Sequence, residues 1–117
     1  MQPHIAHTQV CIAGAGPVGM ALALGLRRQG VAVLLCEARP RLPVDAHSPI
    51  AQRALALSYA SLNFLQDLGI GLSDLSSSPI DTVHISQQGS VGQTRLQASQ
   101  LGLPMLGGVV AYGRLQN

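Results

Sequence analysis

Short apolar runs alternate with glycine-rich breaks at the start of the chain, and this pattern predicts a strand, a helix and a second strand. Residues 9–13 are expected to form the first strand, buried on both faces as in a parallel sheet, because their apolar side chains are continuous. Residues 14–19 (GAGPVG) interrupt that run, and a helix is expected from there to about Gln29. Residues 31–36 form a second apolar run. Two buried strands joined by a helix are expected to lie parallel, with a right-handed crossover.

The expected helix carries its own start and stop signals. Pro17 suits the first turn, because its missing N–H has no intrahelical partner to lose. Val18, Leu22 and Leu26 recur every four residues and are predicted to form the packing face. Gly30 supplies a left-handed stop after the last turn.

The rest of the chain predicts a second helix, a hairpin and further extended segments. Ser58 can cap a helix that runs to Leu68, with Leu62, Leu65 and Leu68 as its packing stripe. The other expected features are an irregular excursion over 38–49, an extended piece over 53–57, a polar loop over 73–79, a hairpin over 80–97 and a strand over 108–112.

The composition indicates one small folded domain and argues against a nucleic-acid-binding protein. The 117 residues fit one small domain, and 47% of them are hydrophobic, which is enough for a buried core. The formal net charge of +2 is too small to indicate a nucleic-acid partner. Aromatic side chains are scarce, so no platform for stacking bases is available. Nucleic-acid binding is therefore excluded.

Cys11 and Cys36 both lie inside apolar runs. We expect two buried, reduced thiols in a cytoplasmic protein, with a disulfide or redox pair as the alternative. The two cysteines lack CxxC spacing, so no metal site is expected.

The amino-terminal residues 1–8 are expected to be a flexible tail, which disfavours a metal site built from His4 and His7. The apolar stretch 10–26 is expected to be neither a signal peptide nor a membrane span. No Lys or Arg precedes it, and four glycines and a proline interrupt it.

The glycine-rich turn has the residue types that a dinucleotide pyrophosphate requires. Gly14 allows the tight exit from the strand, and Gly16 lets the backbone approach the phosphates closely. Gly19 lets the helix pack against the sheet, while the helix amino terminus presents N–H groups and partial positive charge. Glu37 lies 18 residues after Gly19, at the end of the second strand, where a carboxylate can accept hydrogen bonds from ribose hydroxyls. It would repel a 2′-phosphate, so NADP is disfavoured, but the motif alone does not separate FAD from NAD.

Four stretches of the chain resemble the class A flavoprotein aromatic hydroxylases, and within them the ubiquinone-biosynthesis hydroxylases (2-polyprenyl-6-methoxyphenol hydroxylase-like). They are VCIAGAGPVGMALALGL with VLLCEA, RALALSYAS with FLQDLGI, IDTVHISQQGSVGQTRL, and LGGVVAYGRLQ. The first is shared by many flavoproteins, whereas the RALALS and TVHIS segments are more specific. The resemblance covers almost all of the chain from Gln9. It implies an α/β fold, a Rossmann-like FAD-binding βαβ unit with an additional helix and β-hairpin, truncated relative to the family.

The resemblance also implies FAD as the cofactor. Arg53 would reach its phosphate or ribityl region, and Gln116 would lie near the ribityl chain. The cofactor-binding residues that it indicates are Gly14, Gly16, Pro17, Val18, Gly19, Glu37, Ala38, Arg53 and Gln116.

The family chemistry is the hydroxylation of an electron-rich phenol that bears a polyprenyl tail, with NAD(P)H as reductant and O₂ as co-substrate. Association with the membrane surface or a biosynthetic complex is compatible with such a substrate. Two later family segments, an Asp-Gly and a Gly-Asp, do not occur in the sequence. We therefore expect residues 9–117 to be the amino-terminal portion of an FAD-binding domain that is inactive alone, with the hairpin over 80–97 in the substrate-side sheet.

No catalytic residue is assigned from the sequence. His84 is expected to be a hydrogen-bonded surface residue. Arg39 and Arg41 are expected to be solvated loop charges. Two alternatives stay open: an NAD-dependent Rossmann oxidoreductase, which would share the turn and Glu37, and a non-catalytic dinucleotide-binding fragment.

Overall fold

A computed structural model describes residues 7–40, 45, 47–89 and 91–116. They fall into two compact units, the first made of 7–40 with Gln116 and the second of 45, 47–89 and 91–115. Most of the expected flexible tail lies outside the described residues, as do His4 and Arg41. His7 and Thr8 are described and have no regular secondary structure.

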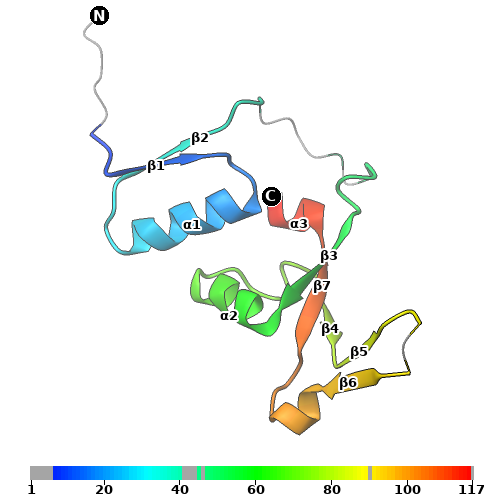
Figure 1. Ribbon diagram of the computed structural model, residues 1–117. Helices are drawn as coiled ribbons and strands as arrows, with labels where there is room; N and C mark the ends of the chain where they lie inside the picture. Colours follow the sequence, from blue (N-terminus) through cyan, green and yellow to red (C-terminus); the bar gives the residue numbers. More distant parts are fainter. Residues whose placement is uncertain (1–6, 41–44, 46, 90, 117) are drawn as a thin grey trace, which may run out of the picture. The chain divides into compact units, whose positions relative to one another are not determined.

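The first unit is a parallel strand pair joined by one helix (Figure 1). Strand β1 (Val10–Ala13) pairs with β2 (Val33–Cys36), and α1 (Pro17–Arg28) connects them. Val10 lies opposite Val33, and Ala13 lies opposite Cys36. The predicted strand–turn–helix–strand order and the parallel pairing are confirmed.

Both ends of α1 follow the sequence signals. Gly16 is the N-cap residue and Pro17 occupies the first turn. Arg27 and Arg28 lie in the last turn, where their charge favours the negative end of the helix dipole. Gly30 has a φ of 80°, in the left-handed region that glycine tolerates, and its N–H donates to the carbonyl oxygen of Arg27.

The packing face expected for α1 is wrong. Val18 is 84% exposed and Leu22 is 49% exposed, whereas Ala23 is buried. The reason is the close approach of Gly19 to β1, since a Cβ on Gly19 would lie against the side chain of Ile12. The helix therefore approaches the strand closely at Gly19, and of the four-residue apolar repeat Val18 and Leu22 are exposed while Leu26 is half-buried.

The expectation that the first strand is buried on both faces, with the second buried as well, is also wrong for the described residues. Ile12 is buried on the face that α1 covers, and its register partner Leu35 is half-buried. Cys11 and Cys36 are exposed, so they are not the buried thiols that the apolar runs predicted. Their face of the two strands has no helix of the described unit against it.

The second unit is built on a three-stranded antiparallel sheet in the order β3-β7-β4. These strands are β3 (Ala54–Ser58), β7 (Gly107–Ala111) and β4 (Ser78–Ile80). The extended piece predicted over 53–57 corresponds to β3. The loop predicted over 73–79 instead contains the buried Leu75 and the first residues of β4, because Ser78 and Pro79 pair with β7.

The second helix, α2 (Tyr59–Asp67), covers this sheet, and its features were predicted. The Ser58 side chain accepts a hydrogen bond from the backbone N–H of Ser61 at 3.2 Å, which is an N-cap. Leu62 is 1% exposed, and Leu65 and Leu68 are half-buried on the same stripe. Leu62 and Val110 of β7 are the largest fully buried side chains of the described core.

The predicted hairpin is present as β5 (Thr82–Ser86) paired antiparallel with β6 (Gln93–Gln97). A short 3₁₀ helix, η1 (Ala98–Leu101), follows it, and α3 (Tyr112–Gln116) follows β7. Membership of the hairpin in a substrate-side sheet stays a prediction. No helix in the part of the chain that the structure describes is long and apolar enough to cross a membrane.

Candidate functional site

The glycine-rich turn lies between the end of β1 and the start of α1, beside the end of β2. Gly14 has a φ of 104°, which an L side chain rarely adopts, so glycine is required at this exit from the strand. Its N–H donates to the carbonyl oxygen of Cys36, with an N···O distance of 2.7 Å. This bond holds the turn against the second strand.

Gly16 leaves open space in front of the helix. A Cβ built on Gly16 would meet no atom within 4 Å. No side chain caps this end of α1, and no acidic residue lies in its first turn. Val18, the second helical residue, is exposed. The amino terminus of α1 therefore presents its partial positive charge to an open region, as a pyrophosphate requires.

At Gly19, in contrast to Gly16, there is no space for a side chain. A Cβ on Gly19 would clash with the backbone carbonyl oxygen of Gly14 and lie 3.5 Å from the Ile12 Cγ2 atom. Glycine at this position therefore lets the first turn of α1 approach the strand exit. The expectation that Gly19 allows helix–sheet packing is confirmed.

The Glu37 carboxylate lies beside the same turn. Its Oε2 atom accepts a hydrogen bond from the Ala15 backbone N–H at 2.9 Å, and its Oε1 atom accepts one from the Arg39 backbone N–H at 3.0 Å. These bonds, with that to Ala15 the larger influence, hold the pKa of Glu37 below its ordinary value. The carboxylate is therefore ionised at neutral pH.

An ionised carboxylate of this kind can still bind a sugar. It offers about four lone-pair positions, and the Ala15 and Arg39 amides use one on each oxygen. Glu37 is exposed, so the remaining positions are accessible to ribose hydroxyls. Ala38 follows directly and is also exposed. The residues present thus fit a dinucleotide, with phosphates at the helix end and ribose at Glu37.

Sequence reasoning missed the part played by Ala15. Its backbone N–H joins the turn to Glu37, but a backbone donor leaves no signature in the residue type. The side chain of Gln9 was also missed: its Oε1 atom accepts from the Ala32 N–H at 2.9 Å and ties the start of β1 to the segment before β2.

Arg53 and Gln116 lie elsewhere in the chain. Arg53 is exposed and precedes β3, and its carbonyl oxygen accepts from the Tyr112 N–H at 2.8 Å, at the start of α3. Gln116 is the last residue of α3. Roles of Arg53 and Gln116 toward a cofactor stay predictions.

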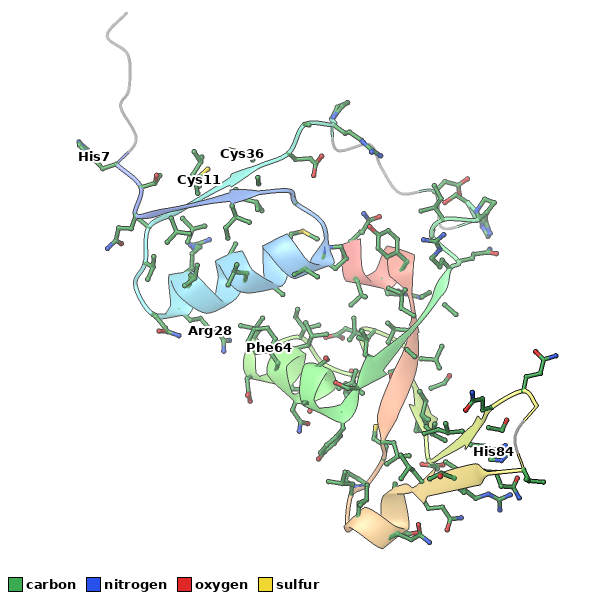
Figure 2. All side chains as sticks on the ribbon, in the orientation of Figure 1. His7, Cys11, Arg28, Cys36, Phe64 and His84 are labelled. Carbon is green, nitrogen blue, oxygen red and sulfur yellow. The ribbon has the colours of Figure 1, made fainter. Side chains whose placement is uncertain are left out.

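Metal binding and a catalytic histidine are the other kinds of site to consider among the described residues. Within them, no group of three or more His, Cys, Asp or Glu side chains could hold a metal ion. His84 is exposed on the hairpin, and its Nε2 atom lies 2.9 Å from the Gln93 Oε1 atom (Figure 2). The expectation of a hydrogen-bonded surface histidine is confirmed.

The FAD binding domain family matches residues 7–104, which include the turn and Glu37. The chain belongs to this FAD-binding family. FAD is accordingly its cofactor, and the α/β fold predicted from the sequence is confirmed.

Curated relatives of the FAD-binding chain are hydroxylases. It is 33% identical over 111 residues to 3-demethoxyubiquinol 3-hydroxylase of Escherichia coli (strain K12), covering 93% of the chain and 28% of that enzyme. It is 41% identical over 71 residues to 3-(3-hydroxy-phenyl)propionate/3-hydroxycinnamic acid hydroxylase of Klebsiella pneumoniae (strain 342), covering 60% of the chain and 12% of that enzyme. The chain thus spans between about an eighth and a quarter of their lengths.

Solved structures give the same fold. The 2,6-dihydroxypyridine-3-hydroxylase of Arthrobacter nicotinovorans matches with a TM-score of 0.57 and 17% identity, over 95% of this chain and 25% of that one. The peptidyl tryptophan dihydroxylase QhpG matches with a TM-score of 0.50 and 25% identity, over 95% of this chain and 21% of that one. The first of these likenesses concerns the fold alone.

Gly16 and Gly19 differ in the space around them, so replacing each by alanine tests the close contact between α1 and β1. Gly19→Ala is expected to lower the free energy of unfolding by about 1–3 kcal/mol, because the new methyl group has no room against the Gly14 carbonyl. Gly16→Ala adds the same group in open space at a φ of −71° and is expected to leave stability unchanged or slightly raised. Urea unfolding of both variants measures the difference. Equal stability of the two would contradict the close helix–strand contact.

The lowered pKa of Glu37 predicts a specific acid dependence. Because the folded pKa lies below the ordinary value, the stabilisation that ionised Glu37 gives the folded state is complete above the ordinary pKa and is lost as the pH falls through the lowered pKa. Glu37→Gln should remove this part of the acid dependence. Carboxyl NMR titration and unfolding between acid and neutral pH measure both effects. A Glu37 titration at or above the ordinary value would refute the bond to Ala15.

Proposed function

We propose that this chain supplies the pyrophosphate and adenosine-ribose part of the FAD site in a flavin-dependent monooxygenase. The observation that carries the proposal is the Glu37 carboxylate 2.9 Å from the Ala15 amide, beside the open helix end at Gly16. In this role Gly14, Gly16, Pro17, Val18 and Gly19 form the phosphate cradle, and Glu37 with Ala38 borders the ribose. FAD supplies the oxygen-activating chemistry when bound, and the protein positions it.

Ligand binding by the chain tests this role. FAD at about 100 times its dissociation constant should raise the free energy of unfolding by about 2.7 kcal/mol, with a smaller effect of NAD at the same concentration. Gly16→Val should abolish the FAD effect, because its side chain would occupy the space of the pyrophosphate. An unchanged circular-dichroism spectrum of Gly16→Val is the folding control. Stronger stabilisation by NAD would favour the NAD-dependent alternative, and undiminished FAD binding by Gly16→Val would disprove the cradle.

We further propose that the substrate is a polyprenyl phenol of ubiquinone biosynthesis, with O₂ and NAD(P)H as co-substrates. The match to 3-demethoxyubiquinol 3-hydroxylase supports this choice, because it extends over 93% of the chain, against 60% for the phenylpropionate hydroxylase. A polyprenyl tail partitions into the bilayer, so the proposal includes a cytoplasmic protein associated with the membrane surface. Arg53 and Gln116 are proposed to contact the phosphate or ribityl part of FAD.

Substrate-stimulated oxidation of NAD(P)H distinguishes the two phenol classes. In the complete hydroxylase, a polyprenyl phenol is expected to accelerate NAD(P)H oxidation and to gain one hydroxyl group, whereas 3-(3-hydroxyphenyl)propionate is not. The reverse preference would replace this substrate assignment and leave the FAD site intact. The proposed FAD site is refuted by a separate result, namely that FAD does not stabilise the chain.

A further inference from the structure

The two cysteines of the first unit lie together on one exposed face. The Sγ atoms of Cys11 and Cys36 are 3.9 Å apart, although 25 positions separate the residues in the chain. Both cysteines are free and exposed, on the face of β1 and β2 that lies away from α1 (Figure 2).

We propose that Cys11 and Cys36 form a reversible disulfide, and that this modification weakens dinucleotide binding at the neighbouring turn. The first part depends only on the position of the two thiols. The second part rests on the FAD site proposed above. In a reducing compartment such a pair is a transient, redox-responsive bond rather than a permanent crosslink.

The chemistry of the step requires a two-electron oxidant, for which we name a hydroperoxide. One cysteine, as its thiolate, attacks a peroxide oxygen, the O–O bond breaks, and the leaving hydroxide takes up a proton to become water. The second thiol then attacks the sulfenic sulfur, the S–O bond breaks, and a second water leaves as the S–S bond forms. Two thiols and hydrogen peroxide thus give one disulfide and two waters.

Strand register explains why the bond would be labile. Cys11 lies opposite Leu34, and Cys36 lies opposite Ala13, so the cysteines are diagonal neighbours. A disulfide holds its sulfur atoms about 2.05 Å apart, so the Sγ atoms must approach each other from their present 3.9 Å. Side-chain rotation and a displacement of the strand ends both contribute to this approach. A disulfide that requires displacement of the backbone is strained, and strained disulfides are more easily reduced.

Cys36 also connects the thiol pair to the dinucleotide turn. Its carbonyl oxygen accepts the hydrogen bond from the Gly14 N–H at 2.7 Å, and Glu37 is the next residue. A shift of Cys36 toward Cys11 therefore moves both the anchor of the turn and the carboxylate that borders the ribose. The hydrogen bond and charge of Cys11 raise the pKa of the Cys36 thiol, which disfavours Cys36 as the thiolate that attacks first.

Oxidation of the intact chain with hydrogen peroxide, followed by peptide mass analysis, tests the bond itself. The expected product is a monomer that has lost about 2 Da and both titratable thiols, with the Cys11 and Cys36 peptides joined and separable by dithiothreitol. Cys11→Ser and Cys36→Ser are the matched controls and should give no such product. Two thiols that persist, or that proceed separately to sulfinic acid or to crosslinked dimers, would overturn the proposal.

Coupling to the turn is measured in two ways on the same samples. Amide hydrogen exchange at Gly14 and Ala15 should become several-fold faster in the oxidised chain, because their acceptors are displaced. The FAD dissociation constant should rise several-fold and recover on reduction, with neither change in Cys11→Ser. Faster exchange without any FAD binding would refute the proposed cofactor site and leave the disulfide intact. A disulfide with unchanged exchange and unchanged FAD affinity would refute the coupling.

Discussion

The hydrogen bond from the Ala15 amide to the Glu37 carboxylate is the interaction on which the candidate site depends. It joins the turn after β1 to the residue after β2, and therefore brings the Glu37 carboxylate beside the open amino terminus of α1. The parallel register positions it, because Ala13 lies opposite Cys36 and each strand ends there. A slip of one residue would turn the side chains to opposite faces and separate the two parts. The site is thus a consequence of the strand pairing.

The three glycines of the turn satisfy three different physical constraints. Gly14 adopts a backbone conformation with positive φ, Gly16 leaves space for a ligand, and Gly19 leaves space for the chain itself. Any side chain at Gly19 would push α1 away from the strand exit, and would move the open helix end with it. Any side chain at Gly16 would leave the fold intact and fill the space of the phosphates. Although all three residues are glycines, Gly14 and Gly19 are required for folding, whereas Gly16 is proposed to be required for binding.

Much of the fold followed from local signals in the sequence. The parallel unit, the Ser58 cap and the hairpin over 80–97 depend on turn residues, caps and apolar runs, which are visible along the chain. The exposure of Val18 and Leu22 on α1 was not predicted, because the close approach to β1 occurs at Gly19, which has no side chain and is not part of the hydrophobic repeat. The exposure of Cys11 and Cys36 depends on what covers a sheet face, which strand composition alone does not specify. Glu37 was predictable from its position, whereas its partner Ala15 acts through the backbone.

Two backbone hydrogen bonds reduce the repulsion that the Glu37 carboxylate would exert on a diphosphate bound at the start of α1. The Ala15 and Arg39 amides offset the charge of Glu37, since each donates a hydrogen bond to one of its oxygens. The N–H groups at the start of α1 remain directed toward the open region at Gly16. In the proposed site, a dinucleotide would meet donors at its phosphates and acceptors at its ribose, and this polarity would determine its orientation. In the proposed site, a 2′-phosphate on the ribose would place like charges together at Glu37, so the site proposed for FAD would disfavour NADP.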